Sequence, residues 1–233
     1  MRKINPNDVR TDFSREVDDV VAYFNRVVGS LAGSPHELGD ITRLAETTFL
    51  TVFVGFERFL SDLFLAYLNR QFGAYRADLE GRVRQSTQER FGAWASQRTR
   101  LDRVQHVRVA DLENIVDPQG RNLTFPSAQD IKEKAQRWLS AAHNARIQGL
   151  SAHDDRVIDT ARAIRDFIAH RSKAALDAMN GYLATVTQGP HNPHLGRGAN
   201  DIHSAGFFLK TVFVAERRVV LYATRLRDIS GVM

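Results

Sequence analysis

Residues 165 to 170 read RDFIAH, and three of them could carry out acid–base chemistry on a phosphate ester. Arg165 has a planar guanidinium, which can hold a phosphate through two parallel hydrogen bonds. His170 supplies an imidazole, the side chain that most readily moves a proton near neutral pH. Asp166 lies one helical turn before His170, so its carboxylate could accept a hydrogen bond from the imidazole and set its tautomer. Together these residues could cleave a phosphodiester without a metal ion.

The spacing of arginine and histidine is weak evidence by itself, because the chain is rich in arginine. A separation of five to seven positions also occurs at Arg100/His106, Arg137/His143, Arg146/His153 and Arg197/His203. Only at Arg165 is the arginine followed directly by an acid or amide. The alternative interpretation is an ordinary exposed Asp–His pair, which would contribute about 0.2–0.5 kcal/mol to helix stability.

The periodicity predicts one long helix around these residues, from 152 to 186. At about 100° per residue, its apolar positions gather on one side. The members of this stripe are Val157, Ala161, Ile164, Ile168, Ala175 and Met179. Arg165 and His170, about 140° apart, flank a polar and cationic face opposite the stripe. We therefore expect neither of them to be buried by the amphipathicity of the helix.

Helical periodicity predicts an all-α fold for most of the remaining chain. The other predicted helices cover residues 8–31, 41–72, 75–97 and 128–147, with a last one that holds Val212, Ala215, Val219, Tyr222 and Leu226. Residues 187 to 206 are rich in Gly, Pro, Asn and His and are predicted to be a loop. No internal repeat or linker divides the sequence, so residues 1–233 are predicted to form a single domain.

Residues 98 to 126 lose the helical pattern and are predicted to be an irregular insertion. An Asp-Pro-Gln-Gly turn at 117–120 separates two short pieces that favour a β conformation. Proline and glycine at these positions are typical of a β-turn. We therefore expect a small hairpin around residues 106–126.

The predicted helix over 41–72 is apolar around more than half of its circumference, which indicates a central helix of a bundle. Glu57 sits inside that apolar arc, beside Phe53 and Phe64. A carboxylate in such surroundings is costly unless a cation meets it. Either Glu57 pairs with an arginine from another helix, for which Arg165 is a candidate, or its side chain reaches water at the edge of the helix.

The chain has a formal net charge of +5, and five of its 32 basic residues are lysine, the others arginine. Arginine binds phosphate through a planar fork and stacks on bases, whereas lysine is a hydrated point charge. The excess favours an anionic partner such as a nucleic acid. The alternative is a GC-rich genome, which replaces lysine by arginine throughout.

The most apolar window, residues 49 to 68, is long enough to span a bilayer but carries Glu57, Arg58 and Asp62. Each charge near the bilayer centre costs roughly 2.5–3.5 kcal/mol on insertion scales, so we expect a buried helix and no membrane association. The opening MRKINPNDVRTDF lacks the apolar run of a secretory signal. Together with the absence of cysteine, this favours a cytoplasmic location.

The absence of cysteine also excludes disulfides, thiolate zinc sites and a cysteine nucleophile. His191 and His194 are of a type that binds metals, but no third ligand accompanies them. We therefore predict no metal site and no cofactor.

The stretch RDFIAH resembles the signature of the HEPN superfamily, in which an arginine, a polar residue and, a few positions later, a histidine lie late in an all-α bundle. GFERFLSDLFLAYLNR, at 55 to 70, is similar to the long early helix of HEPN domains, especially of the RiboL-PSP-associated branch. The closing RVVLYATRLRDI is similar in style. This resemblance implies an up-and-down helical bundle that dimerises, with both signatures in one composite active site.

Many HEPN proteins are metal-independent endoribonucleases that serve as toxins or phage-defence effectors, some of them paired with an antitoxin. The resemblance implies that Arg165 holds the scissile phosphate, that Asp166 is the polar partner and that His170 is the acid or base. It also implies a non-catalytic alternative, because HEPN-like bundles can be adaptors that bind RNA or another protein.

Five further residues follow from this interpretation. The cationic Arg162, Arg171 and Lys173 would contact the RNA, and Glu57 and Ser172 would support the catalytic residues. Branches that pair with nucleotidyltransferase antitoxins have a tyrosine two positions after the histidine, where this chain has Ser172. Regulation by modification of that tyrosine is therefore not expected.

The chemistry explains why a dimer would be needed. Attack of a ribose 2′-oxygen on the adjacent phosphorus calls for a base at the nucleophile and an acid at the leaving oxygen, each contributing about 10²–10⁴ in rate. One chain supplies one His170, and a two-fold interface supplies the second. The expected products carry a 2′,3′-cyclic phosphate and a 5′-hydroxyl, so RNA would be cut and DNA would not.

Overall fold

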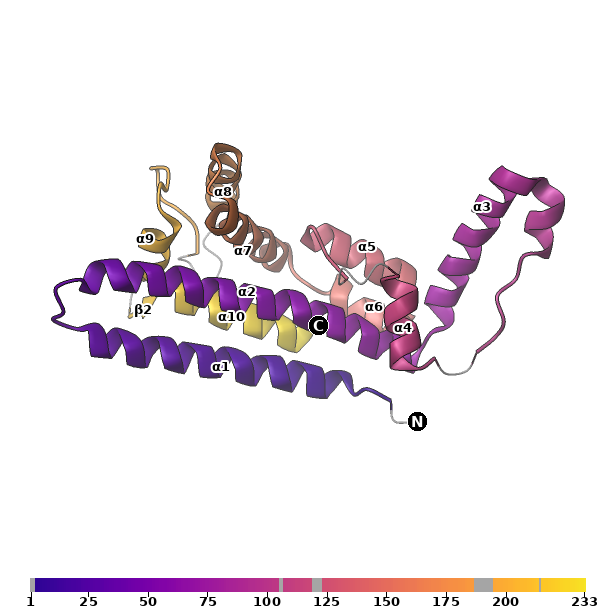
Figure 1. Ribbon diagram of the computed structural model, residues 1–233, viewed down its shortest axis with the longest axis horizontal. Coiled ribbons are helices and arrows are strands. Elements are labelled where there is room, and N and C mark those ends of the chain that lie inside the picture. The colour runs from indigo at the N-terminus through magenta and orange to yellow at the C-terminus, as the bar shows by residue number, and fades with distance from the viewer. Residues whose placement is uncertain (1–2, 105–106, 119–122, 187–194, 214) are drawn as a thin grey trace. The chain divides into compact units, whose positions relative to one another are not determined.

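The computed structural model describes residues 3–104, 107–118, 123–186, 195–213 and 215–233. Its elements are almost all helices, so the predicted all-α helical bundle is confirmed (Figure 1). The helices are α1 (Pro6–Leu31), α2 (Glu37–Arg70), α3 (Gly73–Arg98), α4 (Val109–Val116), α5 (Ala128–Trp138), α6 (Ala141–Gln148), α7 (Ala152–His170), α8 (Lys173–Thr185), α9 (Ala205–Lys210) and α10 (Arg218–Val232). Two short strands, β1 (Val212–Phe213) and β2 (Glu216–Arg217), pair antiparallel. Within the described parts of the chain, no helix is both long and apolar enough to cross a membrane.

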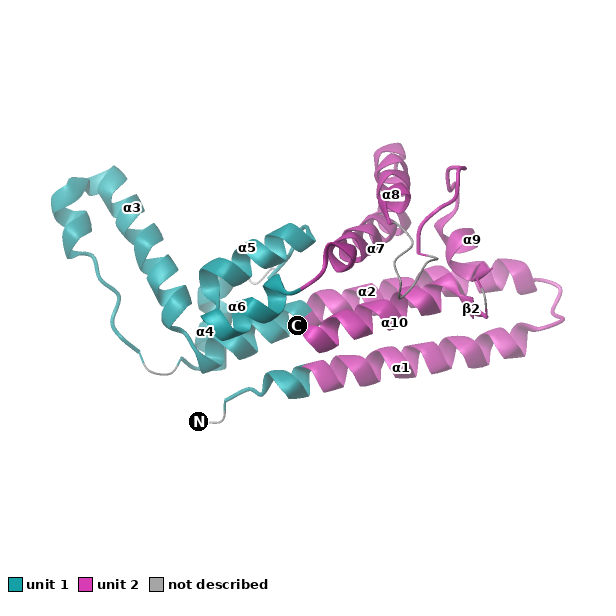
Figure 2. Ribbon diagram, turned by 180° about the vertical axis from the view of Figure 1, so that it is seen from behind, with its two compact units in different colours: residues 1–9, 60–149 teal, residues 10–59, 150–233 magenta. Residues whose placement is uncertain are grey.

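The chain forms two compact units, and the long helix α2 contributes to both (Figure 2). Unit 1 contains residues 1–9 and 60–149, and unit 2 contains residues 10–59 and 150–233. All three predicted catalytic residues belong to unit 2, together with Glu57. The single domain over 1–233 stays a prediction.

In unit 2, the α2 segment lies between α1 and α10, as expected for a central helix. On one side, the ring of Phe13 from α1 stacks on Phe59 with centroids 5.0 Å apart. On another, Phe49 meets the edge of Tyr222 from α10 at 5.6 Å. The fully buried hydroxyl of Tyr222 donates to the carbonyl of Leu195 at 2.6 Å, and burial raises its pKa well above the ordinary value. Aromatic packing therefore fixes the helix that carries Glu57.

In unit 1, the end of α2 packs against α5 and the start of α3. The ring of Phe64 meets that of Trp138 from α5 edge-on with centroids 6.4 Å apart, and Trp138 in turn meets the ring of Tyr75 from α3 edge-on at 5.2 Å. The buried amide of Asn69 donates to the carbonyl of Val107 at 3.0 Å, so a polar bond ties the segment before α4 to α2.

The hairpin predicted around 106–126 is wrong where the structure describes that segment. Residues 109 to 116 form α4 instead, and Leu112 is completely buried. The apolar spacing of this short stretch suits one face of a helix, and burial of that face outweighs the local turn signal. Residues 119–122, in the second half of the predicted turn and beyond it, lie outside the described residues.

Three predicted helices also differ from the structure. The helix over 128–147 is divided into α5 and α6 at Leu139 and Ser140. The last helix begins only at Arg218, because Val212–Phe213 and Glu216–Arg217 form the two short strands instead. The helix over 152–186 ends at His170, where Arg171 adopts a left-handed conformation with φ 52°, and a second helix starts after Ser172.

Candidate active site

Helix α7 carries the predicted catalytic residues and is anchored at its first turn. Ser151 and Asp154 form a capping box, in which each side chain accepts a hydrogen bond from the backbone N–H of the other. Asp154 also pairs with Arg225 of α10. All four members of the predicted apolar stripe that lie on α7 are buried: Val157, Ala161, Ile164 and Ile168. The polar side of α7 is therefore held in a defined orientation.

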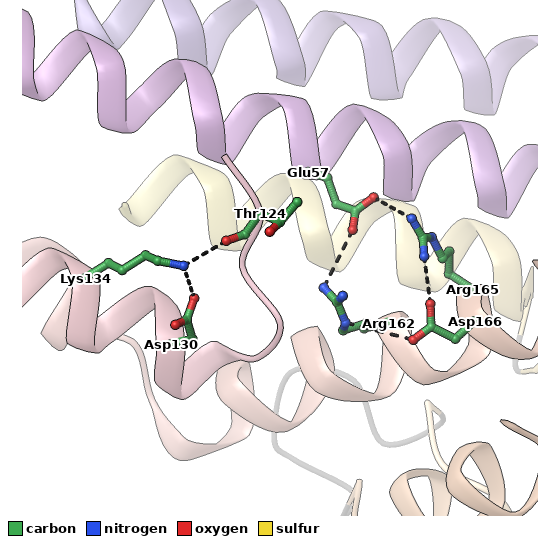
Figure 3. A network of polar contacts seen from close by, with 7 residues as sticks. All are labelled: Glu57, Thr124, Asp130, Lys134, Arg162, Arg165 and Asp166. Atoms are coloured by element: carbon green, nitrogen blue, oxygen red, sulfur yellow. Dashed lines mark hydrogen bonds and ion pairs between the residues drawn. The ribbon is translucent and has the colours of Figure 1, made fainter. Parts of the chain in front are cut away.

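Four charged side chains of unit 2 form one network between α2 and α7, which we call the Glu57 cluster (Figure 3). Nη2 of Arg165 donates to a Glu57 oxygen at 3.2 Å, and Nη1 donates to Asp166 at 2.7 Å. Arg162 lies 3.6 Å from the other Glu57 oxygen and 3.9 Å from Asp166. The predicted pair between Glu57 and Arg165 is therefore confirmed.

The Glu57 cluster is half-buried and its formal charges balance. Its side chains are 25–35 % exposed, so water still reaches all four. Burial alone would lower the pKa of Arg165, but the hydrogen bond to Asp166 and the charge of Glu57 raise it above the ordinary value. A guanidinium has five N–H donors, of which described partners of Arg165 take two. The remaining donors could bind a phosphate oxygen.

His170 occupies the last position of α7 and is exposed. The predicted hydrogen bond between Asp166 and this imidazole is wrong, since the Asp166 oxygens face the guanidiniums of Arg165 and Arg162. Charge-assisted bonds to a guanidinium are stronger than a bond to a neutral ring, which explains the choice. Among the described residues the imidazole has no hydrogen-bond or ion-pair partner, so its nitrogens are accessible to a bound molecule.

The residues after His170 form and stabilise the break between α7 and α8. Arg171 pairs with Glu46 of α2 and lies over the Phe167 ring, 5.4 Å from its centroid. The Ser172 hydroxyl caps α8 by accepting from the N–H of Ala175 at 3.2 Å. Lys173, the first residue of α8, is exposed. The RNA contacts of Arg162, Arg171 and Lys173 stay predictions, and so does the supporting role of Ser172.

Glu46 is a site residue that the sequence reasoning missed. One of its oxygens pairs with Arg171, and the other accepts from the N–H of Gly206 at 2.9 Å. Glu46 and Glu57 are 11 residues apart, which is close to three full turns and places both on one side of α2. Two acids on one side of an apolar helix predict two cationic partners, and this signal could have identified Glu46.

No cluster of three or more metal-binding side chains occurs within the described ranges. His191 and His194 lie outside those ranges, so the structure says nothing of them. What the described site offers is a set of guanidiniums, carboxylates and one accessible imidazole.

Comparison of the chain with protein-family models, with curated proteins and with solved structures gave no match. The HEPN resemblance of RDFIAH therefore stays a prediction. What α7 can do follows from its own side chains and their contacts.

Changing Glu57 to Gln should lower the free energy of unfolding by about 1 kcal/mol, a value kept small because water screens this half-exposed pair. The change keeps an acceptor for Arg165 but removes the negative charge that two guanidiniums share. Urea unfolding measures the difference. The matched control is Glu16→Gln, which weakens a more exposed pair with Arg58 of α2 and should cost less. Equal stability of Glu57→Gln and wild type would show that the charge of Glu57 contributes nothing to the fold.

Proposed function

We propose that this chain is a metal-independent endoribonuclease of the HEPN type. One observation carries the proposal: Arg165 is held at a half-exposed position by two carboxylates, and the exposed His170, which has no partner among the described residues, follows on the last turn of the same helix. A fixed guanidinium and an accessible imidazole are the groups that phosphodiester cleavage by the 2′-oxygen requires.

In the proposed reaction, Arg165 donates its remaining N–H groups to the scissile phosphate and stabilises the extra negative charge at phosphorus. His170 takes the proton of the attacking 2′-hydroxyl, or gives one to the leaving 5′-oxygen. A second copy of the chain supplies the other histidine across a two-fold interface, which brings identical surfaces together. The products are a 2′,3′-cyclic phosphate and a 5′-hydroxyl.

The contacts of Asp166 favour a role in the proposed reaction that differs from the one expected. It bonds to Arg165 at 2.7 Å and lies near Arg162, so it orients guanidiniums rather than the imidazole. Asp166 is thus a positioning residue in the proposal, and Glu57 has the same role from α2. Exposed Lys173 would contact the RNA backbone near His170.

We place this nuclease in the cytoplasm as a toxin or phage-defence effector, acting on RNA and without a cofactor. An antitoxin or another protein of a defence system is the expected protein partner. The toxin or defence role and the protein partner come from the resemblance to HEPN proteins, whereas the location and the absence of a cofactor come from the sequence itself.

A second candidate function is a non-catalytic adaptor. It is favoured by the charge balance of the Glu57 cluster, because two guanidiniums already neutralised by two carboxylates attract a phosphate less strongly than free ones. Such a network also has an ordinary structural role in joining two helices.

The deciding experiment is incubation of the purified chain with tRNA and with rRNA, with and without EDTA, followed by mapping of the ends. The nuclease should release 2′,3′-cyclic phosphate ends equally with and without the chelator, and should leave DNA of the same sequence intact. The adaptor should bind RNA or a protein with an affinity that falls with salt, and release no such ends. Cleavage that EDTA abolishes would contradict the proposal.

A further inference from the structure

Helix α3 of unit 1 is interrupted by a sharp turn at Gly92. The residue has φ 78° and ψ 174°, a backbone conformation that is open essentially to glycine alone. The helical residues before it and those after it therefore point in different directions, as Figure 1 shows. The turn is a feature that the chain specifies by placing glycine there.

The chain after the turn runs back along the first part of α3. The Ser96 hydroxyl donates to the carbonyl of Arg84 at 3.0 Å, and Nε of Arg84 donates to the carbonyl of Thr99 at 2.8 Å. Further along, Arg76 donates to the carbonyl of Leu101 at 3.2 Å. From Ser96 to Leu101 on the second limb, the bonded partner on the first limb moves back from Arg84 to Arg76, so the two limbs are antiparallel. They hold a hairpin-like arm, which we define as residues 73–104, with Gly92 near its tip.

Two large aromatic side chains lie exposed at this tip. Phe91 is 74 % exposed and Trp94 is 70 % exposed, one on each side of Gly92 in the sequence. The guanidinium of Arg98 lies over the Trp94 ring, 4.1 Å from its centroid, and donates to the Trp94 carbonyl at 3.2 Å. Exposing so much apolar surface has a cost in water, so a cluster of this kind indicates a binding surface.

The charges divide the arm into two zones. Near its base, arginines pair with acids four positions away, as in Arg76–Glu80 and Arg82–Asp78. Near the tip, the exposed Arg90 and Arg98 have no carboxylate within ion-pair distance in the described part of the chain. The same holds for Arg100 and Arg103, but these lie further along the returning limb, where Leu101 bonds to Arg76 near the base. Residues 85 to 104 contain only two acids against these four arginines. At the tip itself, the aromatic rings therefore have Arg98 over Trp94 and Arg90 next to Phe91 in the sequence, two arginines without a carboxylate partner among the described residues.

We propose that the tip of the arm binds single-stranded RNA, with bases stacked on Phe91 and Trp94 and phosphates held by Arg90 and Arg98. Aromatic faces within a cationic surface are the combination that single-stranded nucleic acids require. Charge complementarity selects this occupant, since the guanidiniums of Arg90 and Arg98, which have no carboxylate partner among the described residues, match a phosphate chain better than an apolar protein surface does. The inference rests on the proposed function in that it takes RNA as the ligand.

The test measures binding of a fluorescein-labelled oligouridine of about 12 nucleotides to the full chain with His170→Ala, so that no cleavage occurs. Adding Phe91→Ala and Trp94→Ala together should weaken binding by about ten- to a hundredfold. The matched control is Tyr23→Ala, which removes a 54 % exposed ring of α1 with Arg26 at 6.0 Å over it. This control should bind as tightly as its parent.

Tryptophan fluorescence gives a direct readout of stacking. The chain has two tryptophans, and Trp138 is buried at 7 % exposure, so a quencher in solution reaches Trp94. Oligouridine should quench the emission, and Trp94→Phe should remove that quenching while keeping most of the affinity. Unchanged affinity of the double variant, or no binding by its parent, would overturn the assignment of the tip.

The outcomes separate this inference from the nuclease proposal. If wild type releases no cyclic phosphate ends but the double variant loses oligouridine binding, RNA binding by the tip is supported and the nuclease proposal is contradicted. If wild type cleaves RNA and the double variant binds and cleaves RNA equally well, the nuclease proposal is supported and RNA binding by the tip is contradicted. A double variant that changes the oligomeric state by mass photometry, with unchanged RNA affinity, would show the tip to be a protein interface instead.

Discussion

Replacing His170 by alanine should lower RNA cleavage by about 10²–10⁴-fold, the contribution of one general acid or base, and by more if both copies act in one composite site. The side chain is exposed and unpaired among the described residues, so its removal should change the free energy of unfolding by no more than about 0.5 kcal/mol. The loss would therefore be chemical and not structural. Single-turnover cleavage of tRNA, with circular dichroism on the same samples, measures both quantities.

The control for this prediction is His36→Ala. His36 is an exposed histidine in the segment between α1 and α2, so the change removes an imidazole of similar accessibility far along the sequence from α7. It should leave cleavage unchanged. Full activity of His170→Ala would end the nuclease assignment and leave the adaptor as the better account of α7.

The sequence predicted the Glu57–Arg165 pair because the need of a carboxylate in apolar surroundings for a cation can be recognised within one helix. A carboxylate on the apolar arc of a helix needs a cation, and few arginines lie on a neighbouring polar face. The partner of Asp166 could not be predicted in the same way. Both His170 and Arg165 are close along the helix. The choice between them depends on where α2 places Glu57, because this carboxylate contacts the guanidiniums of both Arg162 and Arg165 of α7.

The helix break after His170 escaped prediction for a different reason. Left-handed conformations are uncommon for residues other than glycine, asparagine and aspartate, so Arg171 gives no warning of one. The contacts of Arg171 with Glu46 and Phe167 stabilise that conformation, and they come from residues distant in sequence or buried in the helix. Among the residues at the break, Ser172 alone indicates the start of a new helix, since serine is a preferred N-cap.

The hairpin error at 106–126 has the opposite cause. There a strong local signal, the proline and glycine of the predicted turn, misled the assignment of the residues before it. Burial of Leu112 and the bond from the Tyr75 hydroxyl to the carbonyl of Ile115 favour a helix, and both depend on the tertiary structure of unit 1. The proline and glycine of a turn therefore do not indicate whether the residues before it form a helix or a strand.

Replacing Asp154 by alanine should lower the free energy of unfolding by about 3–5 kcal/mol, the cost of leaving one partner of a buried ion pair alone. One Asp154 oxygen accepts from the N–H and the hydroxyl of Ser151 at 3.1 and 2.8 Å, and the other pairs with Arg225. The two charged side chains are only 11 % and 16 % exposed, so solvent screens them little. Urea unfolding followed by circular dichroism measures the loss.

Two variants divide this effect between the cap and the ion pair. Ser151→Ala removes the cap alone and should cost about 1 kcal/mol. Asp154→Ala combined with Arg225→Met removes the orphaned cation as well, and should recover part of the lost stability. A single Asp154→Ala variant no less stable than Ser151→Ala would show that the pair with Arg225 contributes nothing to stability.

Asp154 holds the first turn of α7, while Arg165 and His170 lie on its later turns. Asp154→Ala should therefore reduce cleavage only by lowering the fraction of folded molecules, with the rate per folded molecule unchanged.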